Sequence, residues 1–128
     1  MSAPTARQSV SFRGPEMHFQ DMLKAIALIE QFVDGMDFPA YLADIKTRAA
    51  VERELQILTE AAYRLKPEDE PLCPEPDWRK IRGMGNILRH AYDRLNDEAV
   101  WLTVKDDLPA LKQAVGNALA THFPSTSS

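Results

Sequence analysis

The chain has 128 residues, of which 45% are hydrophobic, and it carries a formal net charge of −4. This length provides one hydrophobic core and excludes a second domain of ordinary size. The acidic balance excludes a general coating of nucleic acid, so any contact with RNA must be made by a local patch of positive charge.

The two ends of the chain differ in composition from its middle. Residues 1–15 contain no acidic residue and few large apolar ones, and residues 123–128 are mostly polar. We therefore expect a flexible tail at each end and one helical domain over residues 16–122. No apolar run approaches the roughly 20 residues that span a membrane, so we expect no membrane contact.

Cysteine and histidine usage bears on the compartment and on metal binding. Cys73 is the only cysteine, so no disulfide can form within the chain, and we expect a cytoplasmic protein. The three histidines, His18, His90 and His122, lie far apart, and no His-x-x-x-His or Cys-x-x-Cys pair occurs. We expect neither a bound metal nor a cofactor.

Apolar residues recur at helical spacing through most of the domain. This pattern predicts an all-α bundle of four to five helices, with an up-and-down core and one short extra helix. The first helix should begin at Glu16 and end at Val33, because Gly35 follows as a stop signal. Asp37 and Pro39 then predict a cap and the start of the short second helix.

The third helix is predicted over residues 44–65, and its charged residues alternate in sign. Its inward face is expected to hold Ile45, Ala49, Leu55, Leu58, Ala62 and Leu65. Residues 67–77 contain four of the nine prolines and five acidic residues, which predicts a loop.

Two further helices are predicted after this loop. Asp77 should cap a central helix that begins at Trp78 and continues to about residue 91. Asn96 should cap a final helix, with Asp97 near its positive end and a kink near Pro109.

The central helix carries an unusual concentration of positive charge in an acidic chain. In and next to this helix there are five basic residues, Arg79, Lys80, Arg82, Arg89 and Arg94. The only acidic residues close to them in sequence are Asp77 and Asp93. On a helical wheel the core side holds Ile81, Met84, Ile87, Leu88 and Ala91.

The opposite face of this helix combines two guanidiniums, an amide and an imidazole. Arg82, Asn86 and Arg89 fall within about 60° of one another, and His90 lies about 40° beyond Asn86. Guanidiniums bind phosphate through paired donors, and a histidine can transfer a proton at neutral pH. This face therefore suits an RNA phosphodiester, although a solvated basic face with a structural histidine is the alternative.

Two glycines interrupt the same helix. Gly83 and Gly85 each cost about 1 kcal/mol relative to alanine within a helix. We therefore expect them to permit the close approach of another backbone, a partner helix or a ligand.

The segment Gly85-Asn86-Ile87-Leu88-Arg89-His90-Ala91-Tyr92, followed by Asp97-Glu98 and Val100-Trp101, resembles the signature of HepT-like HEPN proteins. Residues 47–53 and 58–62 are similar to the long helix of that family. The resemblance covers roughly residues 17 to 120, nearly the whole predicted domain.

This resemblance implies an all-helical homodimer that acts as a metal-independent endoribonuclease. It further implies a toxin of a type VII-like pair, whose antitoxin is a minimal nucleotidyltransferase. His90 would then be the general acid or base, and Tyr92 the residue that the antitoxin modifies with AMP. Arg48 and Glu60 match positions on the long helix of the family and are expected to border the cleft.

One position departs from the family pattern. Members carry an arginine that is separated from the histidine by four to six residues, and with four intervening residues this position falls here on Gly85. Arg82 or Arg89 would have to supply the charge, with Asn86 orienting the phosphate. The alternative is a non-catalytic HEPN-like adaptor that binds a nucleotidyltransferase or a nucleotide.

Overall fold

The computed structural model describes residues 14–89 and 94–124, and every regular element in these ranges is a helix. The all-α prediction is therefore confirmed. The elements are α2 (Gly14–Val33), α3 (Phe38–Ala43), α4 (Ile45–Arg64), η1 (Pro67–Leu72), α5 (Trp78–Arg89), α6 (Arg94–Leu102), η2 (Thr103–Asp107) and α7 (Leu108–His122).

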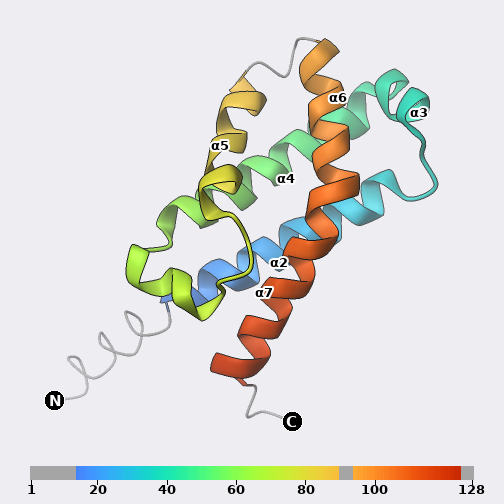
Figure 1. Cartoon of the computed structure of the whole chain (residues 1–128). Helices are drawn as coiled ribbons and strands as arrows, with labels where there is room; N and C mark the ends of the chain where they lie inside the picture. The colour runs from blue at the N-terminus through green and yellow to red at the C-terminus, as the bar shows by residue number, and fades with distance from the viewer. Residues whose placement is uncertain (1–13, 90–93, 125–128) are drawn as a thin grey trace, which may run out of the picture.

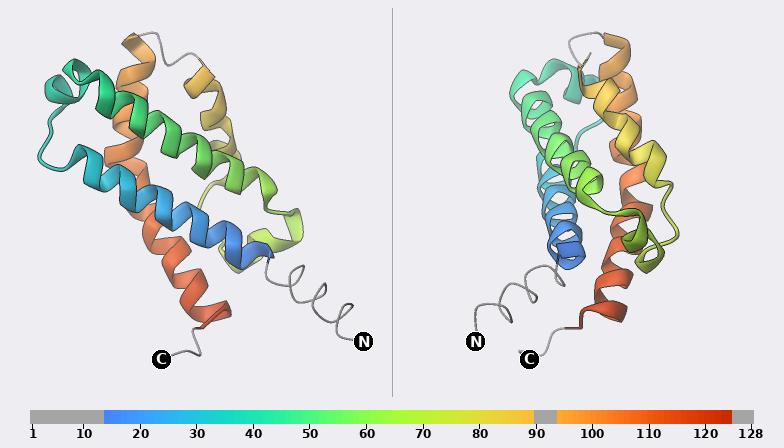
Figure 2. Two further views of the ribbon diagram at one scale, coloured as in Figure 1. Left: turned by 180° about the vertical axis from the view of Figure 1, so that it is seen from behind. Right: turned by 90° about the vertical axis from the view of Figure 1, so that its left-hand side faces the viewer.

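The helices form two layers in an up-and-down arrangement (Figure 1). The first layer consists of α2 and α4, which run antiparallel and pack along much of their length. The second layer consists of α5 and the continuous rod of α6, η2 and α7, as the side view in Figure 2 shows. The end of α5 and the beginning of α6 lie at one end of the bundle, and η1 lies toward the other.

The predicted helix boundaries around the short helix α3 are confirmed. Gly35 follows α2 with a φ of 76°, a left-handed conformation that glycine adopts without strain. The Asp37 side chain accepts a hydrogen bond from the Ala40 amide at 2.9 Å and caps α3. Asp44 caps α4 in the same way through the Thr47 amide, at 3.1 Å.

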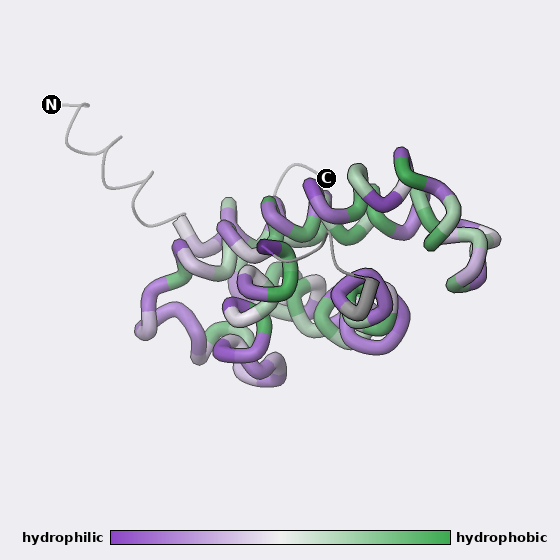
Figure 3. The backbone as a smooth tube through the Cα atoms, turned by 90° about the horizontal axis from the view of Figure 1, so that it is seen from above, coloured by the Kyte–Doolittle hydropathy of each residue, from purple (hydrophilic) through white to green (hydrophobic). Residues whose placement is uncertain are grey.

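The core lies between the two layers, and hydrophobic and hydrophilic residues alternate along each helix (Figure 3). Its largest fully buried side chains are Tyr41, Phe19, Met22, Ile26, Ile29, Leu55, Leu58 and Val51. Two predicted core positions are wrong: Ile45 is 71% exposed, and Ala49 is exposed. The first turns of α4 lie at the end of the bundle beside α3, where one side of the helix faces solvent (Figure 1).

The proline-rich segment contains regular structure that was not expected. Pro67–Leu72 form the 3₁₀ helix η1, and the loop is confined to the residues between it and α5. A proline is tolerated in a first helical turn because its missing N–H would have no partner there. The Asp69 side chain also accepts the Lys66 amide at 3.3 Å, which stabilises this turn.

The final helix begins earlier than predicted and has an irregular middle. Because α6 starts at Arg94, Asn96 lies inside the helix, and its predicted role as a cap is wrong. The kink expected near Pro109 corresponds to a π-helical turn, η2, in which the Leu108 amide donates to the Thr103 carbonyl. Pro109 offers no N–H to the preceding turn, which favours such a departure at this point.

None of the helices in residues 14–89 and 94–124 is both long enough and apolar enough to cross a membrane.

Candidate functional site

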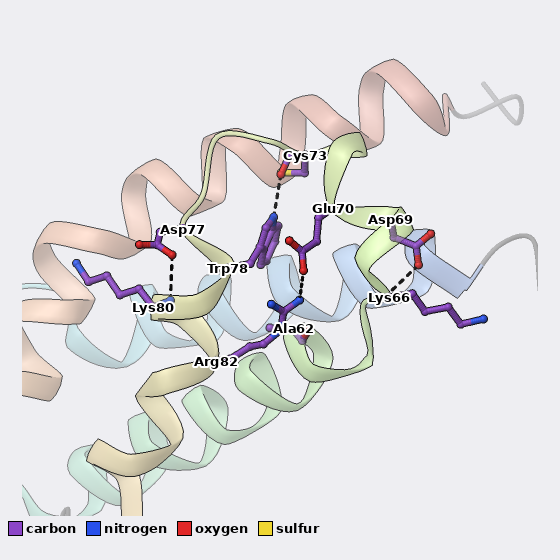
Figure 4. Close-up of polar contacts among 9 residues, drawn as sticks. All are labelled: Ala62, Lys66, Asp69, Glu70, Cys73, Asp77, Trp78, Lys80 and Arg82. Carbon is purple, nitrogen blue, oxygen red and sulfur yellow. Dashed lines mark hydrogen bonds and ion pairs between the residues drawn. The ribbon is translucent and has the colours of Figure 1, made fainter.

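The start of α5 is fixed to the core. Asp77 accepts the Lys80 amide at 3.2 Å and so caps the helix, as predicted. The indole N–H of Trp78, which is 5% exposed, donates to the Cys73 carbonyl at 2.9 Å (Figure 4). The Trp78 ring also packs near Phe19 of α2, with ring centroids 6.4 Å apart. These contacts hold the first turn of α5 against the bundle.

Arg82 points toward α4 and η1. Its Nε donates to the Ala62 carbonyl at 3.2 Å, and a terminal guanidinium nitrogen lies 2.6 Å from Glu70 Oε2 (Figure 4). The first bond gives the Ala62 carbonyl a second donor, since this carbonyl also accepts a hydrogen bond from the Leu65 amide at the end of α4, at 3.3 Å. The Arg82 guanidinium is therefore engaged in joining α5, α4 and η1.

Asn86 and Arg89 are exposed together on the last described turn of α5. The Arg89 guanidinium donates to Asn86 Oδ1, so the predicted pairing of these two side chains on one face is present. A guanidinium has five N–H donors, which leaves most of them for a ligand. His90 and Tyr92, the predicted acid–base residue and modification site, lie outside the described residues.

Arg48 of α4 forms an ion pair with Asp97 of α6, with Nη1 and Oδ2 3.2 Å apart. The side chains are 22% and 4% exposed, so the pair is largely buried. Asp97 lies in the first turn of α6 as expected, but its partner is a guanidinium across the bundle rather than the helix end alone. The pair ties α4 to the beginning of α6, just beyond the candidate histidine in sequence.

Tyr41 and Glu52 complete what we call the α4–α6 polar cluster, together with Arg48 and Asp97. Burial, with Glu52 and Asp97 nearby, raises the pKa of the Tyr41 phenol well above its ordinary value. Burial and then Asp97 raise the pKa of Glu52, while Arg48 opposes that rise. Three buried atoms, Tyr41 Oη, Arg48 Nε and Asp97 Oδ1, have no hydrogen-bond partner among the described residues.

This cluster was not anticipated, although the sequence contains a signal for part of it. Asp97 precedes Val100, Trp101 and Val104 by three, four and seven residues. That spacing places its carboxylate on the apolar face of the helix, where an ionised group needs a partner.

Arg48 and Glu60, the two residues expected to border the cleft, lie far apart along α4, and their place at a cleft stays a prediction. They lie on the same helix, but twelve residues separate them, which is about 18 Å along the axis and 120° around it. Glu60 is exposed and has no ion pair within the described ranges. Of the two, Arg48 is the one linked to the beginning of α6.

The helical glycines face open space within this chain. A Cβ atom added at Gly83 or Gly85 would meet nothing within 4 Å, so no backbone of the described residues approaches them closely. Gly83 borders a cavity of about 540 Å³ between α5 and the start of α7, which has Met84 and Leu111 in its wall. The prediction that another backbone approaches these glycines is wrong for the described residues of this chain. The close approach of a partner helix or a ligand stays a prediction.

The described residues contain neither a cluster of metal ligands nor a reactive thiol. No group of three or more His, Cys, Asp or Glu side chains there is placed to hold a metal ion. Cys73 is buried, and burial, with Glu75 nearby, raises the pKa of its thiol to about 11. The thiol is therefore protonated at neutral pH and is not a nucleophile.

Comparison with known proteins adds independent information. A family described as Ribonuclease HepT-like matches residues 22–118, from α2 to α7. The chain is 38% identical over 100 residues to a protein of Thermococcus cleftensis named "Probable ribonuclease HepT", which covers 78% of this chain and 91% of that protein.

More distant relatives carry similar names. The chain is 27% identical over 106 residues to a protein of Methanocaldococcus jannaschii named as a candidate RNase, which covers 83% of this chain and 97% of the relative. A second candidate RNase, from Caldanaerobacter subterraneus, is 29% identical over 106 residues, or 82% of this chain and 94% of the relative. No solved structure matches the chain.

Proposed function

The chain belongs to the family of HepT-like ribonucleases, and from that premise we propose that it is a metal-independent endoribonuclease. The observation that carries the proposal is the exposed pair of Asn86 and Arg89 on the last turn of α5, directly before His90. A guanidinium and an amide are thereby adjacent on one exposed helix turn, and the histidine follows directly in the sequence. This combination can bind a phosphate and transfer a proton.

In the proposed reaction, the 2′-hydroxyl of RNA attacks the neighbouring phosphorus, and the bond to the 5′-oxygen breaks. His90 acts as the general base or acid, a contribution of about 10²–10⁴-fold in rate. Arg89 binds the phosphate and stabilises the charge that develops on its oxygens, while Asn86 orients it. We assign Arg82 to holding α5 in place, because phosphate binding would require it to leave Glu70 and Ala62.

We further propose that the active form is a homodimer. One histidine per site does not readily perform both proton transfers, whereas two copies of the exposed end of α5 would provide two. Gly83 and Gly85 support this proposal, since the space beside them is open to a second chain. Sedimentation velocity at micromolar concentration should give twice the chain mass, and a persistent monomer would refute the dimer.

The regulatory partner in this proposal is a minimal nucleotidyltransferase antitoxin, and the protein is the toxin of a cytoplasmic type VII-like pair. Family resemblance supports the assignment, with Tyr92 as the acceptor of AMP. Incubation with the cognate transferase and ATP should add the mass of AMP to the peptide that contains Tyr92. An unmodified peptide after complete reaction conditions would count against this regulation.

The activity is tested with a labelled structured RNA in EDTA. Wild type should cleave it, and His90→Ala should lose about 10²–10⁴-fold in rate. Gln113→Ala, at an exposed position of α7, is purified in parallel as a control for contaminating ribonuclease and should cleave like wild type. Equal rates for wild type and His90→Ala would exclude the proposed role of His90.

One observation favours a second candidate function. Gly85 stands where family members carry the arginine, so the chain also suits a non-catalytic adaptor that binds a nucleotidyltransferase or a nucleotide. A folded, dimeric wild type that binds the transferase but leaves RNA intact would support the adaptor. Cleavage that depends on His90 would exclude it.

A further inference from the structure

A second cavity lies at the end of the bundle opposite the last turn of α5 and the first turn of α6. It has a volume of about 620 Å³, which is within the range of small-molecule sites. The start of α2, the end of α4, η1 and the end of α7 meet around it (Figure 1). It is therefore separate from the candidate ribonuclease site at the far end of α5.

Four side chains that are or can become positively charged line this cavity: His18, Arg64, Lys66 and His122. They come from three helices and from the segment before η1, so the fold brings them together from distant parts of the sequence. Arg64 and Lys66 form no ion pair with any acidic group in the described ranges. Two permanent positive charges are thus available to a ligand.

The acidic groups of the cavity are Glu68 and Asp69, both from η1. The Asp69 side chain already accepts a hydrogen bond from the Lys66 amide. Asp69 also raises the pKa of His18, but burial and Arg64 lower that pKa by more. Asp21, on α2 beside His18, acts in the same direction as Asp69. Burial and then the Arg64 guanidinium therefore lower the pKa of His18 below its ordinary value, although Asp21 and Asp69 oppose this.

The remaining wall of the cavity is apolar. Leu72, Pro15 and the Phe123 ring line it, and Leu72 and Phe123 pack at the same time against the core. A flat ring next to a cationic rim suits a ligand with an anionic end and a planar or apolar body.

From this arrangement we propose that the cavity binds a phosphate monoester, with the phosphate held by Arg64, Lys66 and the two histidines and the attached group against Phe123. Arginine binds phosphate oxygens through paired N–H donors, and lysine adds a point charge. A phosphate dianion stabilises the protonated form of His18, so binding opposes the lowering of its pKa. A free metabolite and the phosphorylated end of an RNA share this chemistry.

The two histidines provide a direct readout. The chain has three histidines, so in the His90→Ala variant the only imidazoles left are those of His18 and His122, both in the cavity wall. Phenyl phosphate is the probe, and inorganic phosphate and phenol are its two halves. We expect phenyl phosphate to move both imidazole NMR signals, to raise the pKa of His18, and to bind at least about tenfold more tightly than either half.

Charge variants on one helix then test specificity. Arg64→Gln should weaken the binding of phenyl phosphate by about tenfold or more, because it removes the paired donors. Arg53→Gln removes the same charge from an exposed position of α4 outside the cavity and should leave the affinity unchanged. Equal weakening by both variants, or unmoved imidazole signals at several millimolar phenyl phosphate, would overturn the proposal.

Two further ligands separate the sources of the phosphate. A 5′-phosphorylated 2′-O-methyl trinucleotide cannot be cut through its 2′ position, and AMP represents a free metabolite. Tighter binding of the trinucleotide would assign the cavity to an RNA end, and equal or tighter binding of AMP would assign it to a small molecule. These measurements use binding alone, so their outcome is independent of whether the protein cleaves RNA.

Discussion

The two halves of α5 differ in how the fold uses their polar side chains. In the first half, the Trp78 indole and the Arg82 guanidinium bind the Cys73 loop, α4 and η1. In the second half, Asn86 and Arg89 are exposed and bind only each other among the described residues. A helical wheel places Arg82 and Arg89 on one face, yet Arg82 is bonded to Glu70 and the Ala62 carbonyl whereas Arg89 is exposed. Two arginines on one face of a helix can thus have different roles, one in anchoring the helix and one in binding.

The largest effect should come from removing the anchor. Trp78→Ala leaves a cavity in the core and should lower the free energy of unfolding by about 3–5 kcal/mol. Trp78→Phe keeps most of the ring but leaves the Cys73 carbonyl without its donor, at a cost of about 1–3 kcal/mol. Urea denaturation followed by circular dichroism measures both. A loss below 1 kcal/mol for Trp78→Ala would show that α5 is not anchored here.

The next prediction concerns Gly85, which stands where family members carry an arginine. Gly85→Arg should increase RNA cleavage by about tenfold or more, because it restores a guanidinium close to the developing charge. The first atom of the new side chain meets no obstacle in this structure, since a Cβ atom at Gly85 has nothing within 4 Å.

Gly85→Ala serves as the control for this gain. It should raise the free energy of unfolding by about 0.5–1 kcal/mol without raising the cleavage rate. If both variants changed cleavage equally, helix stability rather than the guanidinium would be the cause.

The two arginines of α5 should separate stability from activity. Arg82→Gln should lower the free energy of unfolding by about 1 kcal/mol, since Glu70 and the Ala62 carbonyl lose a partner that is 24% exposed. Arg89→Gln should keep stability within about 0.5 kcal/mol and reduce RNA cleavage. Denaturation and initial cleavage rates are compared for both. The reverse pattern would exchange the roles assigned to these residues.

The smallest effect concerns the α4–α6 polar cluster. Because the folded state raises the pKa of Glu52, folding disfavours its ionised form. This penalty is absent below the pKa of the unfolded chain and is complete above the raised pKa. Glu52→Gln should therefore raise the urea midpoint relative to wild type at pH 7 and leave it unchanged at pH 4. A larger gain at pH 4 would contradict the sign of this shift.

Local signals in the sequence were sufficient for most of the fold. The caps at Asp37, Asp44 and Asp77 and the stop at Gly35 act over a few residues, so the start of α3, α4 and α5 could be predicted. The beginning of α6 was misplaced because Asn96 resembles a cap, although the helix had already begun at Arg94.

The candidate site depended on contacts between distant residues, which periodicity does not reveal. Arg82 and Glu70 are twelve residues apart, and Arg48 and Asp97 are forty-nine residues apart. A wheel gives the direction of a side chain but not its partner, so Arg82 seemed available for phosphate. The exposed pair of Asn86 and Arg89 was predictable because the two residues are three positions apart on one helix.

The π-helical turn at Thr103–Asp107 sets the rotational phase between α6 and α7. A π turn, with its i→i+5 hydrogen bond, holds about one residue more than an α turn for the same rotation, so it absorbs one residue without turning the apolar stripe of α7 away from α2. Leu111, Ala114 and Val115 therefore face the core although the helix contains this extra residue. Deleting one residue at the exposed positions Lys105 or Asp106 would convert the segment to a regular α turn, whereas the same deletion inside α7 would rotate the rest of its apolar stripe by about 100°.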